Sequence, residues 1–170
     1  MIPKATLRKA LNDPGLLGTS LEGESWHAWR TLLLAIMGEA LTDAELVTFQ
    51  RLTGRDAAPL ERVEEFVGVI GRRGGKSRAM GVLGAYIAAL CDHSSKLAAG
   101  ERGLVLLIAP DQKQSRVLLG YVEGALRSSP RSHPGPNTRN ALSQQRHRHR
   151  GPRRQLQAAP RRYQRRHYRR

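Results

Sequence analysis

Cysteine and long apolar runs are scarce in this sequence. Cys91 is the only cysteine among 170 residues, which rules out an internal disulfide, fits a reducing cytoplasm and excludes a disulfide-stapled secreted scaffold. The longest apolar runs, LLLAIM and LVLLIA, are far shorter than the roughly 20 residues that a membrane helix needs. The first residues also contain no apolar core of the signal-peptide type. The sequence therefore predicts a soluble cytoplasmic protein with no membrane partner.

Acidic residues and lysine are missing from the last part of the chain. Residues 131–170 contain 13 Arg and no Lys, Asp or Glu, a net charge of +13, whereas residues 1–130 hold 16 Lys+Arg and 14 Asp+Glu, a net charge of +2. Residues 131–170 also lack Val, Ile, Phe, Met, Trp and Cys. Because such a segment has little apolar surface to offset the entropy of ordering its backbone, we predict that residues 131–170 form a disordered basic tail.

The beginning of the chain has the periodicity of helices. Between positions 25 and 37 the apolar residues at three- and four-residue spacing are Trp26, Trp29, Leu32, Leu33, Ile36 and Met37. This spacing places one apolar stripe along a helix. Thr42 followed by Glu45 is a capping-box pattern that predicts the start of a second helix, and Gly54 predicts its end. Residues 1–60 are therefore predicted to form a helical N-terminal region.

From residue 61 the pattern changes to alternating strands and helices. Residues 66–70 (FVGVI) are apolar and rich in β-branched side chains, and a glycine-rich turn leads from them into the apolar stretch 79–90. A second apolar run, residues 104–109, precedes another expected helix at 111–126. This order is typical of a βαβ unit with a parallel sheet and a right-handed crossover. We therefore predict an α/β domain over residues 61–130, incomplete and marginally stable because two strands make a poorly covered sheet.

One loop carries the residues with recognisable chemistry. Positions 71–77 are occupied by Gly71, Arg72, Arg73, Gly74, Gly75, Lys76 and Ser77. This run departs from the P-loop pattern G-x-x-x-x-G-K-[ST] only at Ile70, where the pattern has its first glycine. Gly74 and Gly75 would let successive backbone N–H groups face a β-phosphate next to the N-terminus of the following helix. Lys76 would reach the phosphate oxygens of ATP, and the Ser77 hydroxyl would coordinate Mg²⁺.

Other interpretations of these residues stay open on sequence grounds. The loop could be an ordinary glycine-rich turn with incidental basic residues, and Arg72 and Arg73 could either stabilise phosphoryl charge or lie in solvent. Trp26 and Trp29 fit a helix core better than stacking on an adenine. Asp111 is the one acid that follows an expected strand, and it fits a helix N-cap better than the Mg²⁺-binding acid of an ATPase.

The segments SWHAWRTLLLAI, GRRGGKS and LVLLIAPDQKQSR together resemble the N-terminal ATPase part of bacteriophage terminase large subunits, over about residues 22–126. The resemblance implies an ASCE-type P-loop ATPase that packages double-stranded DNA in a bacterial cytoplasm, with the terminase small subunit and the portal as partners. By matching position, Lys76 and Ser77 take the phosphate and Mg²⁺ roles, and Arg72 or Arg73 takes the loop-arginine role. The Walker B acids, the coupling motif and the nuclease of that family have no counterpart in this sequence, so ATP binding is expected without hydrolysis.

Two other function classes compete with this interpretation. A small nucleotide kinase or another P-loop enzyme would need a substrate lid and a strand-end acid, and neither is found in the sequence. A non-enzymatic basic nucleic-acid-binding protein would use residues 131–170 to contact phosphates. The Arg-rich segment itself has two explanations, a selected basic arm or, favoured by its lack of Lys, a GC-rich gene translated in a shifted reading frame. Sequencing the gene in relatives decides between them.

Overall fold

The structure of the chain is a computed structural model that describes residues 1–129, and the predicted tail at 131–170 lies outside the described residues. The described part is mostly helical. Its α-helices are α1 (Leu7–Asn12), α2 (His27–Ile36), α3 (Asp43–Thr53), α4 (Lys76–Leu90) and α5 (Gln112–Arg127). Its shorter elements are the 3₁₀ turns η1 (Gly18–Leu21), η2 (Glu24–Trp26) and η3 (Ser94–Lys96) and the strands β1 (Ile2–Pro3) and β2 (Cys91–Asp92).

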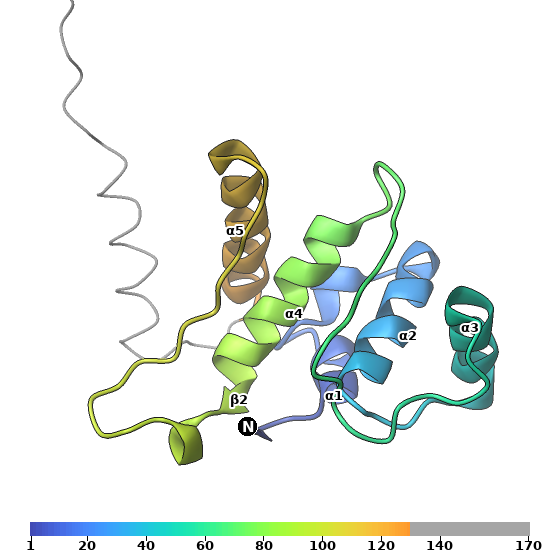
Figure 1. The fold of residues 1–170 in the computed structure, drawn as a ribbon, viewed down its shortest axis with the longest axis horizontal. Coiled ribbons are helices and arrows are strands. Elements are labelled where there is room, and N and C mark those ends of the chain that lie inside the picture. Colours follow the sequence, from blue (N-terminus) through green and yellow to red (C-terminus); the bar gives the residue numbers. More distant parts are fainter. Residues whose placement is uncertain (130–170) are drawn as a thin grey trace, which may run out of the picture.

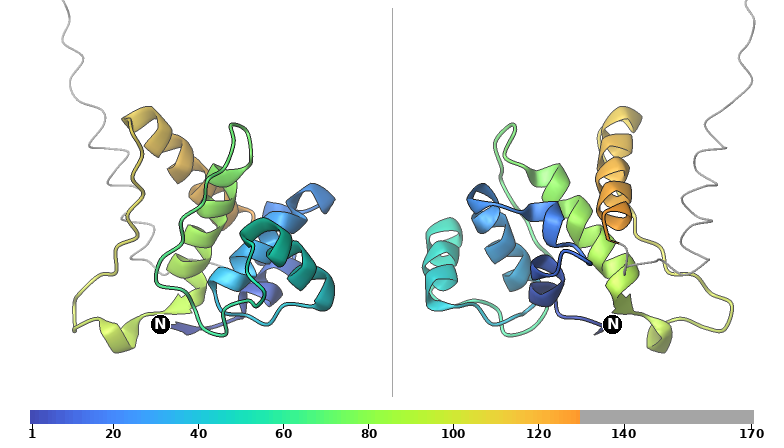
Figure 2. Two further views of the ribbon diagram at one scale, coloured as in Figure 1. Left: turned by 45° about the vertical axis from the view of Figure 1, so that its right-hand side comes forward. Right: turned by 180° about the vertical axis from the view of Figure 1, so that it is seen from behind.

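The helix α4 lies at the centre of the arrangement. Figures 1 and 2 show α5 along one side of α4, α1 and α2 on the other side, and α3 outside α2. The close approach of α4 and α5 requires Gly81, because a Cβ at this position would lie 2.6 Å from the Cβ of Tyr121. The strands β1 and β2 pair antiparallel with Ile2 opposite Asp92, which ties the N-terminus to the chain that follows α4.

Side-chain caps start three of the helices. Thr6 caps α1 through its hydroxyl, and Asp111 caps α5 through its carboxylate. Thr42 and Glu45 form the complete capping box of α3, and Gly54 ends that helix in the left-handed conformation with a φ of 68°. The sequence predictions for both ends of α3, and for Asp111 as an N-cap, are therefore confirmed.

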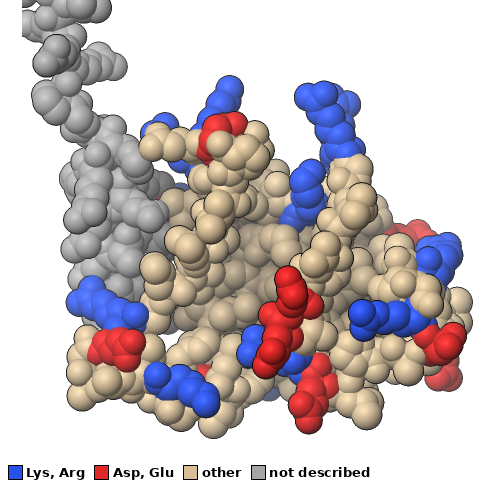
Figure 3. All heavy atoms as spheres, in the orientation of Figure 1, with Lys and Arg blue, Asp and Glu red and all other residues tan. Residues whose placement is uncertain are grey.

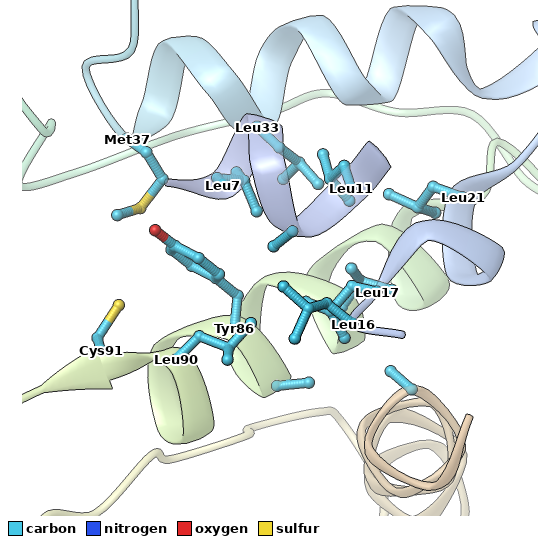
Figure 4. Packing of buried hydrophobic residues seen from close by; sticks show 14 of the residues in the cluster. Leu7, Leu11, Leu16, Leu17, Leu21, Leu33, Met37, Tyr86, Leu90 and Cys91 are labelled. Atoms are coloured by element: carbon cyan, nitrogen blue, oxygen red, sulfur yellow. The ribbon is translucent and has the colours of Figure 1, made fainter. Parts of the chain in front are cut away.

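The hydrophobic core lies between α4 and the N-terminal helices. Its fully or almost fully buried members include Leu7, Leu11, Leu17, Leu21, Leu33, Val82, Ala85 and Tyr86. Tyr86 points from α4 into this core in Figure 4, and its hydroxyl donates to the carbonyl oxygen of Ala5 at 2.8 Å. The core thus draws on residues from both the predicted 1–60 region and the predicted 61–130 region, and the two parts share it.

The predicted α/β fold with a parallel P-loop sheet is wrong. The sheet in residues 1–129 has two strands, β1 and β2, and they are antiparallel. Residues 66–70 and 104–109, the two predicted strands, are instead irregular segments, drawn as thin tubes in Figure 1. The backbone groups at 64–70 and 102–110 make no hydrogen bond to any described residue. Because a strand needs a neighbour to complete its ladder, β propensity alone does not make these segments a sheet.

Both irregular segments expose apolar side chains, and burial alternates along the second of them. Val67 and Val69 are 81% and 103% exposed. In the second segment Leu106 and Ile108 are 70% and 79% exposed, while Leu107 between them packs against the core. Alternate burial is what an extended chain shows when one of its faces lies on a helix layer. Alternate residues of the run 104–109 therefore lie against the helices, and neither segment is part of a sheet.

An ion pair joins α1 to α3. The Nη1 and Nη2 atoms of Arg8 lie 2.9 and 2.8 Å from the two carboxylate oxygens of Glu45. The Arg8 guanidinium, with a further hydrogen bond from the Thr42 backbone, lowers the pKa of the Glu45 carboxyl from 4.5 to about 2. The pair therefore favours the ionised carboxylate in the folded chain.

We expect acid to remove the contribution of this ion pair. Since the pKa of Glu45 is lower in the folded chain, its stabilisation is complete above about pH 4.5 and is lost as the pH falls toward about 2. Glu45→Gln should lower the free energy of unfolding by about 1 kcal/mol at neutral pH, a value that allows for solvent screening of the partly exposed Arg8. Urea titrations of both proteins across this pH range measure the effect. A difference that stays constant down to about pH 2 contradicts it.

Candidate functional site

The seven residues predicted to bind a nucleotide form one continuous turn at the start of α4. The turn spans residues 71–75, and Lys76 and Ser77 are the first two residues of the helix. The exposed members are Gly71, Arg72, Arg73, Gly74 and Lys76, and the half-buried members are Gly75 and Ser77. In Figure 1 this turn lies at the end of α4 that is farther from β2. The helix therefore begins at Lys76, where the sequence analysis expected it.

The backbone of the turn changes handedness where it enters the helix. Arg73 and Gly75 have φ values of 64° and 78°, and Gly75 in the left-handed region is followed directly by helical Lys76. Successive residues of opposite handedness aim their N–H groups toward one centre, a geometry that recurs in anion-binding loops. A hydrogen bond from the Gly74 N–H to the Gly71 carbonyl oxygen, 3.2 Å long, closes the turn.

The N-terminus of α4 has no side-chain cap. Its N-cap residue is Gly75, which has no side chain, whereas α1, α3 and α5 each have a polar N-cap side chain. Within the described part of the chain, the backbone N–H groups of residues 75–78 make no hydrogen bond. The first bonded amide is that of Ala79, which donates to the Gly75 carbonyl oxygen at 3.1 Å. These free donors lie at the positive end of the helix dipole, where an anion is favoured.

Basic residues belong to the same turn as the free amides. The exposed ones in the turn are Arg72, Arg73 and Lys76, and Figure 3 shows basic side chains projecting from its tip. Arg78 behaves differently, because its guanidinium lies 4.8 Å from the centroid of the Trp26 ring and its Nε donates to the Ser20 carbonyl oxygen at 2.7 Å. Arg78 therefore holds η1 and η2 against α4, and the exposed basic side chains of residues 71–77 are those of Arg72, Arg73 and Lys76.

Two tryptophans that the sequence analysis assigned to the core contact this turn. Trp29 is 7% exposed, and its indole Nε1 donates to the Gly74 carbonyl oxygen at 2.7 Å. A Cβ on Gly75 would lie 2.9 Å from ring carbon Cζ3 of Trp26, so glycine is required there. Sequence reasoning missed these contacts because 45 positions separate Trp29 from Gly74. The tryptophan residue type was the one signal in the sequence that pointed to such a contact, because a buried indole N–H needs an acceptor.

The segment before the turn departs from the prediction. A buried strand was expected to end at Ile70, but residues 66–70 form no strand and Val69 is fully exposed. Ile70 occupies the position of the first P-loop glycine and packs on the turn, with its Cγ2 atom 2.6 Å from where a Gly74 Cβ would lie. The turn is therefore supported by Ile70 and by the two tryptophans rather than by a sheet.

Other candidate residues have structural roles. Asp111 holds the N-cap of α5, and hydrogen bonds from Gln114 lower the pKa of its carboxyl. Cys91 is buried directly after α4, and burial raises the pKa of its thiol. In residues 1–129 no three His, Cys, Asp or Glu side chains are grouped so as to hold a metal ion. Ser77, at the second position of α4, remains the predicted Mg²⁺ ligand.

Comparison of the chain with family models, curated proteins and solved structures gives no significant match. Among the helices of residues 1–129, none has both the length and the apolar character needed to cross a membrane. Within residues 1–129 the turn at 71–77 is the strongest candidate for a functional site.

Proposed function

We propose that residues 71–77 bind the phosphates of ATP and that the chain is an ATP-binding portion of a terminase-like DNA-packaging motor. The N–H groups of residues 75–78 would surround the phosphate oxygens, and the Lys76 ammonium would pair with the β- and γ-phosphates. The Ser77 hydroxyl would complete the coordination of Mg²⁺, and Arg72 or Arg73 would lie beside the γ-phosphate.

One observation carries the proposal. The sequence GRRGGKS lies as an exposed turn whose left-handed Gly75 leads directly into a helix with free N-terminal amides. A match to G-G-K-S in the sequence alone is weak evidence of phosphate binding, because the motif can bind phosphate only where it forms a turn that leads into a helix. The start of α5 differs from that of α4, because the Asp111 carboxylate already accepts the Gln114 N–H at 2.8 Å.

The proposed role is nucleotide binding without turnover. Hydrolysis needs an acid that holds Mg²⁺ and a group that activates water, and the best-placed acid in the sequence, Asp111, is the cap of α5. Double-stranded DNA, the terminase small subunit and the portal enter the proposal as partners through the resemblance alone. A bacterial cytoplasm as the location has the same basis.

Lys76→Ala should weaken ATP binding by about 10- to 100-fold, because the substitution removes a charge-assisted contact to phosphate and leaves the backbone turn in place. Isothermal titration calorimetry of the full chain with ATP and Mg²⁺ measures the change. Lys113→Ala is the matched control, since it removes an exposed lysine from the first turn of α5, whose N-terminus Asp111 caps. Equal affinity of the wild type and Lys76→Ala, or an equal loss in Lys113→Ala, would count against the proposal.

A basic nucleic-acid-binding protein is the second candidate. The 13 Arg in residues 131–170, with no acidic residue among them, favour it. Guanidinium groups contact phosphates without regard to base sequence and with a strong dependence on salt. The two candidates are separable, because ATP binding would depend on Lys76 and DNA binding on residues 131–170.

A further inference from the structure

Trp29 sets the direction of one peptide group in the turn before α4. The peptide unit between Gly74 and Gly75 contains the carbonyl oxygen that accepts the Trp29 indole N–H at 2.7 Å. In a planar trans peptide the C=O and the N–H point in opposite directions. The N–H of Gly75 therefore points away from Trp29 and α2, and it is one of the free donors at the start of α4.

If this peptide group pointed the opposite way, the turn would be less suited to binding an anion. With the peptide reversed, the Gly74 carbonyl oxygen would stand on the side where the amides of residues 75–78 are free, and its partial negative charge would repel a phosphate. The reversal would also leave the Trp29 indole N–H without its acceptor. Because Trp29 is 7% exposed, this donor would stay buried and unpaired, which is unfavourable.

A second aromatic ring lies beside the same peptide. The Trp26 ring lies against Gly75, with Cζ3 2.9 Å from the position of a Cβ on that glycine. Arg78, in the first turn of α4, stacks on Trp26 and donates to the Ser20 carbonyl oxygen. The residues at the start of α2 thus support the turn both at the Gly74–Gly75 peptide and at the first turn of the helix.

We propose that Trp29 is a positioning residue for phosphate binding, whose indole N–H holds the Gly74–Gly75 peptide so that the Gly75 amide faces the bound anion. This role rests on the ATP-binding function proposed above. Trp29 acts through the peptide and does not contact the ligand. Its buried ring and its distance in sequence from the turn make it a residue that no local motif would identify.

Trp29→Phe keeps an aromatic ring on α2 and removes the donor. We expect the full chain with this substitution to bind ATP in the presence of Mg²⁺ about tenfold more weakly in calorimetry, with its circular dichroism spectrum preserved. In the ligand-free protein, hydrogen exchange should become faster at the amides of Gly74 and Ala79, which are bonded to carbonyl oxygens within the turn. Trp29→Tyr also lacks the indole donor, and it replaces Trp29→Phe should that variant fold poorly.

Phe49→Leu is the matched control, because Phe49 is a buried ring on α3 that lies outside the turn. It should retain the ATP affinity of the wild type. Unchanged affinity in Trp29→Phe, or the same loss in Phe49→Leu, overturns the positioning role and leaves the ATP-binding function standing. Absence of ATP binding by the wild-type chain contradicts that function instead. Exchange at Gly74 and Ala79 then decides separately whether Trp29 holds the turn, since unchanged rates in Trp29→Phe show that it does not.

Discussion

Removal of residues 131–170 is expected to lower the affinity of the chain for double-stranded DNA by about a thousandfold at low salt. This segment carries +13 of the net charge of +15, and residues 1–130 carry the remaining +2. Each phosphate that a basic side chain neutralises releases counterions and steepens the plot of log affinity against log salt by about 0.9. The truncated chain should therefore lose most of its salt dependence together with its affinity.

Fluorescence anisotropy of a labelled duplex, measured from about 50 to 200 mM KCl, gives both the affinity and the slope. A full-length variant with the 13 Arg changed to Lys is the control, and it should retain most of the binding because the charge is kept. Lys76→Ala should leave DNA binding unchanged. A truncated chain that binds with the full affinity and slope would place the contact within residues 1–130 and remove the second candidate function.

The helices α3, α4 and α5 could be predicted because they carry their own signals. Thr42, Glu45 and Gly54 mark both ends of α3 within a short stretch of chain. Asp111 marks the start of α5, and the apolar stretch predicted from residue 79 lies within α4. Local signals suffice for a helix because its hydrogen bonds join residues four positions apart. The capping residues satisfy donors that the helix itself leaves free.

The strands could not be predicted from local signals, because their hydrogen bonds must come from another segment. Residues 66–70 and 104–109 have the β-branched and aliphatic composition of strands, but no described residue completes a ladder beside them. The run LVLLIA is also uncharged, and Leu106 and Ile108 within it are exposed. An unpaired apolar segment of this kind favours self-association, and the marginal stability expected from the sequence stays a prediction.

The position of the candidate site was predictable, but its support was not. Gly75 could be assigned to a tight turn from its residue type, because glycine tolerates the positive φ of 78° that the turn requires. The contacts of Trp26 and Trp29 with the turn depend on how α2 packs beside α4, and no spacing within the loop reports that packing. The sequence predicted the loop at the correct position but predicted a sheet beside it, and the loop is instead supported by Ile70, Trp26 and Trp29.

Tyr86 in α4 is the largest fully buried side chain of residues 1–129. Its ring is fully buried and lies near Leu7, Met37 and Leu90 in Figure 4, and its hydroxyl binds the Ala5 carbonyl oxygen. Burial raises the pKa of this hydroxyl, so the group stays neutral. Because α4 begins at the candidate loop, a change that displaces the helix also displaces the loop.

Tyr86→Ala is expected to unfold the chain. Truncation of a buried aromatic ring costs about 3–5 kcal/mol, which is a large share of the roughly 5–15 kcal/mol that stabilises a small domain. Tyr86→Phe is the control, because it keeps the ring, loses one hydrogen bond worth about 1 kcal/mol and should still fold. Near-UV circular dichroism and urea titration measure both variants, and ATP binding should disappear together with the near-UV signal of Tyr86→Ala. A cooperative urea transition of Tyr86→Ala at the wild-type midpoint would show that this ring is not essential to the core.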